Sequence, residues 1–177
     1  DGASIAVTRP DRRPGAADPL STMDRWNMTA DSPAWEFTTI PAMCAQAART
    51  YGDQLFIEDG DTSMTFTEFD AMRRRIAKAF MASGIAKGDK VMIWGPNTWK
   101  WFATAMGLVS AGGVLIPCST RFKGTEVSEL IRRSETSLMI SAGNFLGQYY
   151  PDMLNAEGRA PLRDIVVFDD AHATEVS

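Results

Sequence analysis

The chain has 177 residues, of which 45% are hydrophobic and 23% charged, a balance typical of one folded domain with an apolar core. Eighteen basic residues stand against 22 acidic ones, which gives a formal charge of −4. Because the basic residues are scattered along the chain, they form no continuous basic face, and nucleic acid is excluded as an expected partner.

Cysteine and histidine are too sparse to build a cross-linked or metal-bound protein. The chain holds only Cys44, Cys118 and His172 of these types. A disulfide framework and a zinc site with ordinary ligand spacing are therefore not expected. No apolar stretch approaches the roughly 20 residues that cross a bilayer. We expect no metal site and no transmembrane segment, and a reducing, cytoplasmic location.

Residues 1–34 are predicted to be a flexible leader that runs into the domain. The first 22 residues are rich in proline, arginine and glycine and contain few large apolar side chains. Met23 and Met28 are candidate natural starts of translation. The alternative is a functional arm that binds a partner, but chain ends are more often unanchored.

The next segment is predicted to form a helix and a β-hairpin. A helix is expected over residues 38–52, because Pro41 falls in its first turn and Gly52 follows its last apolar residue. Two apolar runs, 55–57 and 64–66, are separated by Asp59-Gly60, a pair suited to a tight turn with positive φ. These features predict a hairpin directly after the first helix.

A second helix is predicted to begin at Thr67 and to end at Gly84. The side-chain oxygen of Thr67 is the expected N-cap, with Asp70 three residues further on. Apolar residues recur with helical spacing, and we expect Arg73 on the opposite, solvent-facing side with Arg74 and Lys78.

From Val91 onward, a repeating strand and helix unit predicts an α/β fold with a mainly parallel sheet and flanking helices. Short apolar runs begin near Val91, Val114, Leu138 and Ile165. The gaps between them hold helix-like stretches, as right-handed crossovers require. We expect helices capped at Asn97 and opened by Thr125, and a weaker helix over residues 145–157. Gly112-Gly113 follow a helix, so we interpret them as a helix stop.

Ligands of open parallel sheets bind beyond the carboxyl ends of the strands, here after Trp94, Pro117 and Ser141. The loop Gly95-Pro96-Asn97 contains one glycine where a dinucleotide-binding fingerprint has three. A free-standing dinucleotide-binding dehydrogenase is therefore not expected.

No residue in these loops is predicted to be catalytic. Cys118 follows a strand, but no histidine lies near it in the sequence to act as a base, so a buried structural thiol is expected. The dense aromatic residues are either a base-stacking platform or core packing, and the absence of a basic groove favours packing for Trp94, Trp99, Trp101 and Phe102. The acidic residues of the hairpin turn are expected to be solvated, namely Glu58, Asp59 and Asp61.

Several blocks then fall in register with a known family pattern, namely residues 65–69, Gly84-Ile85, 88–91, Asn97, 107–117, 120–122 and Glu126. Together they resemble the adenylate-forming superfamily, which includes acyl-CoA ligases, luciferases and the adenylation domains of peptide synthetases. The resemblance covers about residues 35–170 and is specific because separate blocks keep their spacing. Within the superfamily, Thr120-Arg121-Phe122 is similar to the acyl-CoA ligases.

The resemblance implies an AMP-forming acyl-CoA ligase that activates a fatty or other carboxylic acid. The whole enzyme would form an acyl-adenylate from the acid and ATP with magnesium, and then transfer the acyl group to the thiol of CoA. In some members, the arginine that matches Arg121 lies near the phosphates of CoA, where a guanidinium suits bidentate contact. The ordinary alternative is a surface arginine at the start of the next helix.

The resemblance also implies that residues 35–170 are only the opening lobe of the family's large domain. The Ser/Thr/Gly-rich loop that ends in lysine is expected downstream of residue 177, and residues 171–177 are expected to be a polar tail. We therefore expect the chain alone to be inactive and to self-associate through exposed apolar surface. One alternative is a non-enzymatic α/β module that binds a nucleotide or a partner protein. Another is an incomplete reading frame, because the chain begins with Asp1.

Overall fold

The computed structural model describes residues 38–155 and 161–168. The chain divides into two units, 1–34 and 35–177, and the described residues all belong to the second. The predicted leader, the predicted tail and His172 lie outside the described residues.

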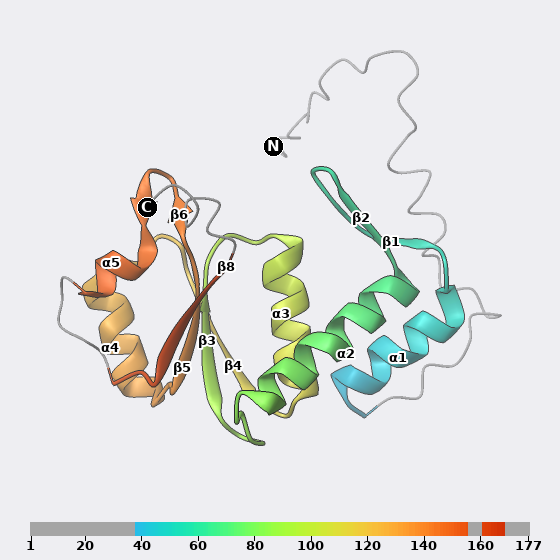
Figure 1. The fold of residues 1–177 in the computed structure, drawn as a ribbon, viewed down its shortest axis with the longest axis horizontal. Helices are drawn as coiled ribbons and strands as arrows, with labels where there is room; N and C mark the ends of the chain where they lie inside the picture. Colours follow the sequence, from blue (N-terminus) through green and yellow to red (C-terminus); the bar gives the residue numbers. More distant parts are fainter. Residues whose placement is uncertain (1–37, 156–160, 169–177) are drawn as a thin grey trace, which may run out of the picture. The chain divides into compact units, whose positions relative to one another are not determined.

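A four-stranded parallel sheet forms the centre of this unit (Figure 1). Its strands are β3 (Lys90–Trp94), β4 (Val114–Cys118), β5 (Leu138–Ala142) and β8 (Asp164–Phe168), in the order β4-β3-β5-β8. Every residue of β5 is buried, and so are the last four of β3, as continuous apolar runs in central parallel strands predict. The expected α/β fold with a mainly parallel sheet is confirmed.

Helices cover both faces of the sheet, and alternate residues of β3 divide the core between them. Helices α2 (Phe66–Ala82) and α3 (Trp99–Ser110) lie on one face, and α4 (Gly124–Ser134) and α5 (Tyr150–Asn155) on the other (Figure 1). Val91 and Ile93 pack toward α2 and α3 in one apolar cluster. Met92 and Trp94 pack toward α4 and α5 in the other. Such two-sided burial explains why β3 carries no polar side chain after Lys90.

The predicted first helix and hairpin are both present. Helix α1 (Ile40–Tyr51) has Thr39 as its N-cap, and strands β1 (Leu55–Asp59) and β2 (Thr62–Thr65) pair in antiparallel fashion. Gly60 adopts φ +58° in the turn between them. The hairpin is joined to α2 and α3 through an aromatic cluster, in which the ring centroids of Phe56 and Phe69 are 5.0 Å apart and those of Phe69 and Phe102 are 5.3 Å apart.

The predicted N-cap of α2 was wrong, because the helix begins two residues earlier. Thr65 accepts a hydrogen bond from the backbone N–H of Glu68 at 3.2 Å, and the Glu68 carboxylate accepts one from the backbone N–H of Thr65 at 2.8 Å. This reciprocal capping box satisfies two N–H groups at once. Thr67 lies inside the first turn of the helix instead, and its backbone N–H donates to the carbonyl of Gly52 at 3.1 Å.

The expected exposure of Arg73 was also wrong. Its side chain is 4% exposed, and its guanidinium donates to Asp70 at 3.0 Å and to Ser110 Oγ of α3 at 2.7 Å. Helices α2 and α3 approach closely, since a Cβ added at Gly107 would lie 2.4 Å from Cγ2 of Ile76. This close packing encloses Arg73, and its ion pair with the Asp70 carboxylate offsets part of the free-energy cost of burying the charge.

Three further predictions of local structure require correction. Thr98, rather than Asn97, caps α3. Helix α4 begins at Gly124, one residue before Thr125. The helix predicted over residues 145–157 is instead a short hairpin, β6 (Asn144–Phe145) and β7 (Gln148–Tyr149), followed by α5. Its turn places Leu146 at φ +51° and Gly147 at φ +75°, a pair of positive φ angles that suits a two-residue hairpin and interrupts a helix.

Candidate functional site

The carboxyl ends of the strands form the candidate site, as the fold class predicts. The loop after β4 is a hydrogen-bonded turn, in which the N–H of Phe122 donates to the carbonyl of Ser119 at 3.1 Å. The N–H of Arg121 donates to Ser119 Oγ at 3.2 Å. The side chain of Arg121, the one site residue that the sequence suggested, is exposed on this turn.

Two buried aromatic residues lie beneath the β4–α4 loop. Trp94 at the end of β3 is fully buried, and its indole N–H donates to the carbonyl of Ser119 at 3.0 Å. The hydroxyl of Tyr150 donates to the carbonyl of Thr120 at 3.1 Å. The two rings pack with centroids 4.5 Å apart. Packing of Trp94 in the core is confirmed, whereas sequence reasoning missed Tyr150 because it predicted a continuous helix there.

Cys118 is a structural thiol, as expected. It is 5% exposed, and burial, with the nearby Glu126 carboxylate, raises the pKa of the thiol to about 12. Because the thiolate is the nucleophilic form, this cysteine remains unreactive at neutral pH.

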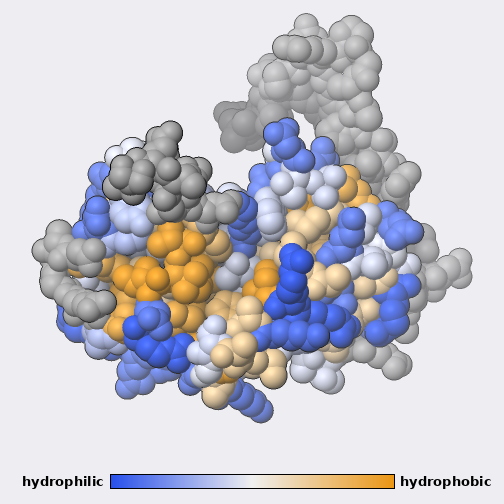
Figure 2. Space-filling model, viewed as in Figure 1, coloured by the Kyte–Doolittle hydropathy of each residue, from blue (hydrophilic) through white to orange (hydrophobic). Residues whose placement is uncertain are grey.

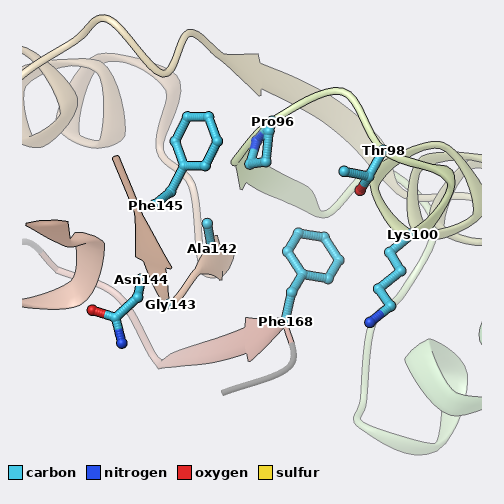
Figure 3. A pocket seen from close by; sticks show the side chains of 8 residues that line it. All are labelled: Pro96, Thr98, Lys100, Ala142, Gly143, Asn144, Phe145 and Phe168. Atoms are coloured by element: carbon cyan, nitrogen blue, oxygen red, sulfur yellow. The ribbon is translucent and has the colours of Figure 1, made fainter. Parts of the chain in front are cut away.

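A second part of the strand edge contains a small pocket of about 150 Å³ between the ends of β3, β5 and β8 (Figure 3). Its walls include apolar side chains and a polar rim, namely Pro96, Ala142, Phe145 and Phe168 with Thr98, Lys100 and Asn144. A Cβ added at Gly95 would lie 3.4 Å from Cβ of Ala142 and 3.7 Å from the Phe168 ring. This glycine therefore faces protein rather than a ligand, unlike the glycines of a phosphate-binding loop.

The acidic residues of the β1–β2 turn are exposed, as expected, but Asp59 has a structural role. Its carboxylate accepts a hydrogen bond from the backbone N–H of Trp99 at 2.8 Å. A carboxylate at the first N–H of a helix is favourable for both its hydrogen bond and its charge. Within residues 38–155 and 161–168, no group of three candidate ligands could hold a metal ion.

The family of the chain follows from comparison with known proteins. The family model described as AMP-binding enzyme matches residues 44–175, well over half of the chain. The chain therefore belongs to the AMP-binding enzyme family, in agreement with its resemblance to adenylate-forming enzymes.

Its relatives in this family include acyl-CoA ligases. A methyl-dioxo-octahydroindenyl-propanoyl:CoA ligase of Rhodococcus jostii is 38% identical over 62% of this chain and 21% of its own length. The long-chain-fatty-acid–CoA ligase FadD13 of Mycobacterium tuberculosis is 33% identical over 49% of this chain and 18% of its own length. The chain thus spans about a fifth of the length of these curated relatives.

A solved structure shows which part of such enzymes the chain resembles. The N-terminal domain of FACL13 from Mycobacterium tuberculosis superposes with a TM-score of 0.69 and 26% identity, over 78% of this chain and 36% of that domain. The described fold is therefore similar to part of the N-terminal domain of FACL13. No helix among the described residues combines the length and apolar character that a membrane span needs.

Proposed function

We propose that the chain forms the opening lobe of the large domain of an AMP-forming acyl-CoA ligase. The whole enzyme would activate a fatty or other carboxylic acid with ATP and magnesium, and then transfer the acyl group to CoA. The observation that carries this proposal is the family match over residues 44–175, with relatives that are named as CoA ligases. The same match disfavours the alternative of a non-enzymatic nucleotide- or partner-binding module.

The described residues act in this proposal as a scaffold. Adenylation needs groups that hold triphosphate and magnesium and that offset developing charge. In the described part of the chain, no group of three or more His, Cys, Asp or Glu side chains could hold a metal ion, and we propose that the groups that hold magnesium and triphosphate belong to the rest of the enzyme. Gly95, in the loop after β3, lies against Ala142 instead of leaving space for a phosphate. We therefore propose that these 177 residues alone form no acyl-adenylate.

Arg121 is the residue that we propose contacts CoA. Arg121 is exposed on a turn in which the carbonyls just before it, at Ser119 and Thr120, accept hydrogen bonds from Trp94 and Tyr150. An arginine on a fixed backbone suits a phosphate, because its planar donors can bind two oxygens at once. The simpler role, a solvated arginine before α4, predicts no loss of CoA affinity on substitution.

The domain organisation also remains a proposal, with a leader over 1–34, the incomplete AMP-binding domain over 35–170 and a polar tail over 171–177, in a cytoplasmic enzyme.

We also propose that the chain self-associates through exposed apolar surface. Apolar side chains gather over the region of β5 and β8 (Figure 2). Val114 on β4 is 43% exposed and Val166 on β8 is 49% exposed, and these strands are the two edges of the described sheet. Exposed apolar edges favour association with another chain.

A chimaera tests the proposed function. Residues 38–168 would replace the aligned part of FadD13 from Mycobacterium tuberculosis, and AMP release and acyl-CoA formation would be measured with a long-chain fatty acid. We expect ligase activity, because the transplanted lobe should support the downstream groups of the host. A chimaera that folds and binds ATP, yet forms neither product, would contradict the proposal.

A further inference from the structure

One residue outside the predicted site, Tyr150, contacts the ends of three strands. Its backbone N–H donates to the carbonyl of Gly143, just after β5, at 3.1 Å. Its ring packs on Trp94, the last residue of β3. Its hydroxyl donates to the carbonyl of Thr120, just after β4. Tyr150 itself is 3% exposed, so these contacts are shielded from water.

The β4–α4 loop has little burial of its own. The side chains at 119 and 121–123 are exposed, while the two carbonyls at Ser119 and Thr120 accept hydrogen bonds from buried aromatic side chains. An exposed turn with few apolar contacts ordinarily opens easily. The hydrogen bonds from Trp94 and Tyr150 join this backbone to buried side chains of the core.

We infer that Tyr150 is a positioning residue that fixes the β4–α4 loop, and Arg121 with it, against the ends of β3 and β5. The functional consequence rests on the proposed contact between Arg121 and CoA, but the positioning itself does not. Burial, with the nearby Cys118, raises the pKa of the Tyr150 hydroxyl. The hydroxyl therefore remains a hydrogen-bond donor across the neutral range.

Site-resolved amide exchange of the 177-residue chain tests the positioning. Tyr150→Phe removes the hydroxyl and keeps the ring. We expect the Arg121 and Phe122 amides to exchange about 5- to 10-fold faster, since one hydrogen bond to the loop is lost. The amide of Ile140 in β5 should be unaffected. Ser134→Ala is the matched control, because it removes a hydroxyl that donates to a backbone carbonyl at the far end of α4. Unchanged loop exchange in a folded Tyr150→Phe chain would overturn the inference.

A measurement on the unsubstituted chain covers the case in which Tyr150→Phe does not fold. In equal parts of light and heavy water, a slowly exchanging tyrosine hydroxyl gives two resolved signals for the ring carbon that bears it. We expect two signals for Tyr150, and a single averaged signal would count against a fixed hydrogen bond.

Titration with CoA, followed by the same amide signals, separates this inference from the proposed function. We expect Tyr150→Phe to weaken CoA binding several-fold, and Arg121→Ala to weaken it at least as much. If loop exchange rises but neither variant changes CoA affinity, the positioning stands and the contact between Arg121 and CoA fails. If only Arg121→Ala weakens binding and loop exchange is unchanged in Tyr150→Phe, the contact stands and the positioning fails.

Discussion

The carboxylate of Asp59 accepts a hydrogen bond from the backbone N–H of Trp99 at 2.8 Å, which joins the turn of the β1–β2 hairpin to the first turn of α3. These residues are 40 positions apart in the sequence. The contact lies next to the loop between β3 and α3, so it connects the N-terminal hairpin to the carboxyl edge of the sheet, where the candidate site lies.

Substitution of Asp59 tests this connection. Asp59→Ala removes the acceptor and should lower the free energy of unfolding by about 0.5–1 kcal/mol, as loss of a helix N-terminal contact typically does. Asp59→Asn keeps an acceptor of the same shape and should lose less. Urea unfolding of both variants measures the difference. Equal stability of Asp59→Ala and the unsubstituted chain would show that the contact contributes nothing.

The buried pair of Arg73 and Asp70 gives a larger expected effect. Arg73→Ala leaves the 12% exposed Asp70 side chain without one of its two partners, and it leaves Ser110 without its arginine contact. Loss of one member of a buried ion pair costs about 3–5 kcal/mol, so we expect a loss at the lower end because Arg74 still pairs with Asp70. Arg74→Ala, at an exposed position, is the matched control and should cost less than about 1 kcal/mol. Comparable losses for the two arginines would contradict the structure.

The lowered pKa of the Asp70 carboxyl should make the free energy of unfolding depend on pH. Burial raises the pKa of its carboxyl, but hydrogen bonds from Arg74 and Arg73 lower it more, so the folded-state value lies below the ordinary one. A lowered pKa means that the stabilisation is fully present above the unfolded pKa of about 4 and is lost as pH falls through the folded value. Unfolding free energies measured from pH 6 to pH 3 should fall less steeply in Asp70→Asn than in the unsubstituted chain. Identical slopes would refute this assignment.

Gly107 tests the close approach of α2 and α3. The added methyl group of Gly107→Ala would lie 2.4 Å from Cγ2 of Ile76, and overpacking of this kind typically costs about 1–3 kcal/mol. Ile76→Ala removes the nearest atom, so the double variant should recover part of the loss that Gly107→Ala causes. A double-mutant cycle in chemical denaturation measures this coupling. Strict additivity of the two substitutions would argue against direct contact.

The buried thiol of Cys118 should react slowly with thiol reagents. With its pKa at about 12, the thiol is almost entirely protonated at neutral pH, and its burial also hinders access. Ellman's reagent should therefore modify half-buried Cys44 before Cys118 in the folded chain, and both in denaturant. Cys118→Ser distinguishes the two signals. Rapid modification of Cys118 under native conditions would contradict the buried, protonated thiol.

The sheet was predictable from sequence because its strands carry a strong local signal. Val91 and Leu138 each open a short, continuous apolar run, and central parallel strands require such runs. The end of the helix at Gly112 was also predictable from a local signal. Glycine adopts a positive φ without steric cost, and Gly112 has φ +88°.

What the sequence did not reveal depends on contacts between distant segments. Arg73 has the helical position of a surface residue, and it is buried because Gly107 lets α3 approach α2. The position of Tyr150 could not be predicted because the hairpin before it was not recognised. The turn of this hairpin has positive φ angles at Leu146 and Gly147, and leucine rarely adopts a positive φ. The sequence did signal a capping box at Thr65 and Glu68, and this pattern would have placed the start of α2 correctly.

Calorimetric titration of the 177-residue chain with ATP and magnesium tests most directly whether this lobe is a scaffold without its own triphosphate site. We expect no saturable heat from this chain at micromolar to millimolar ATP, while an intact acyl-CoA ligase measured alongside gives a saturable isotherm. Stoichiometric binding of ATP with micromolar affinity by this chain alone would contradict it.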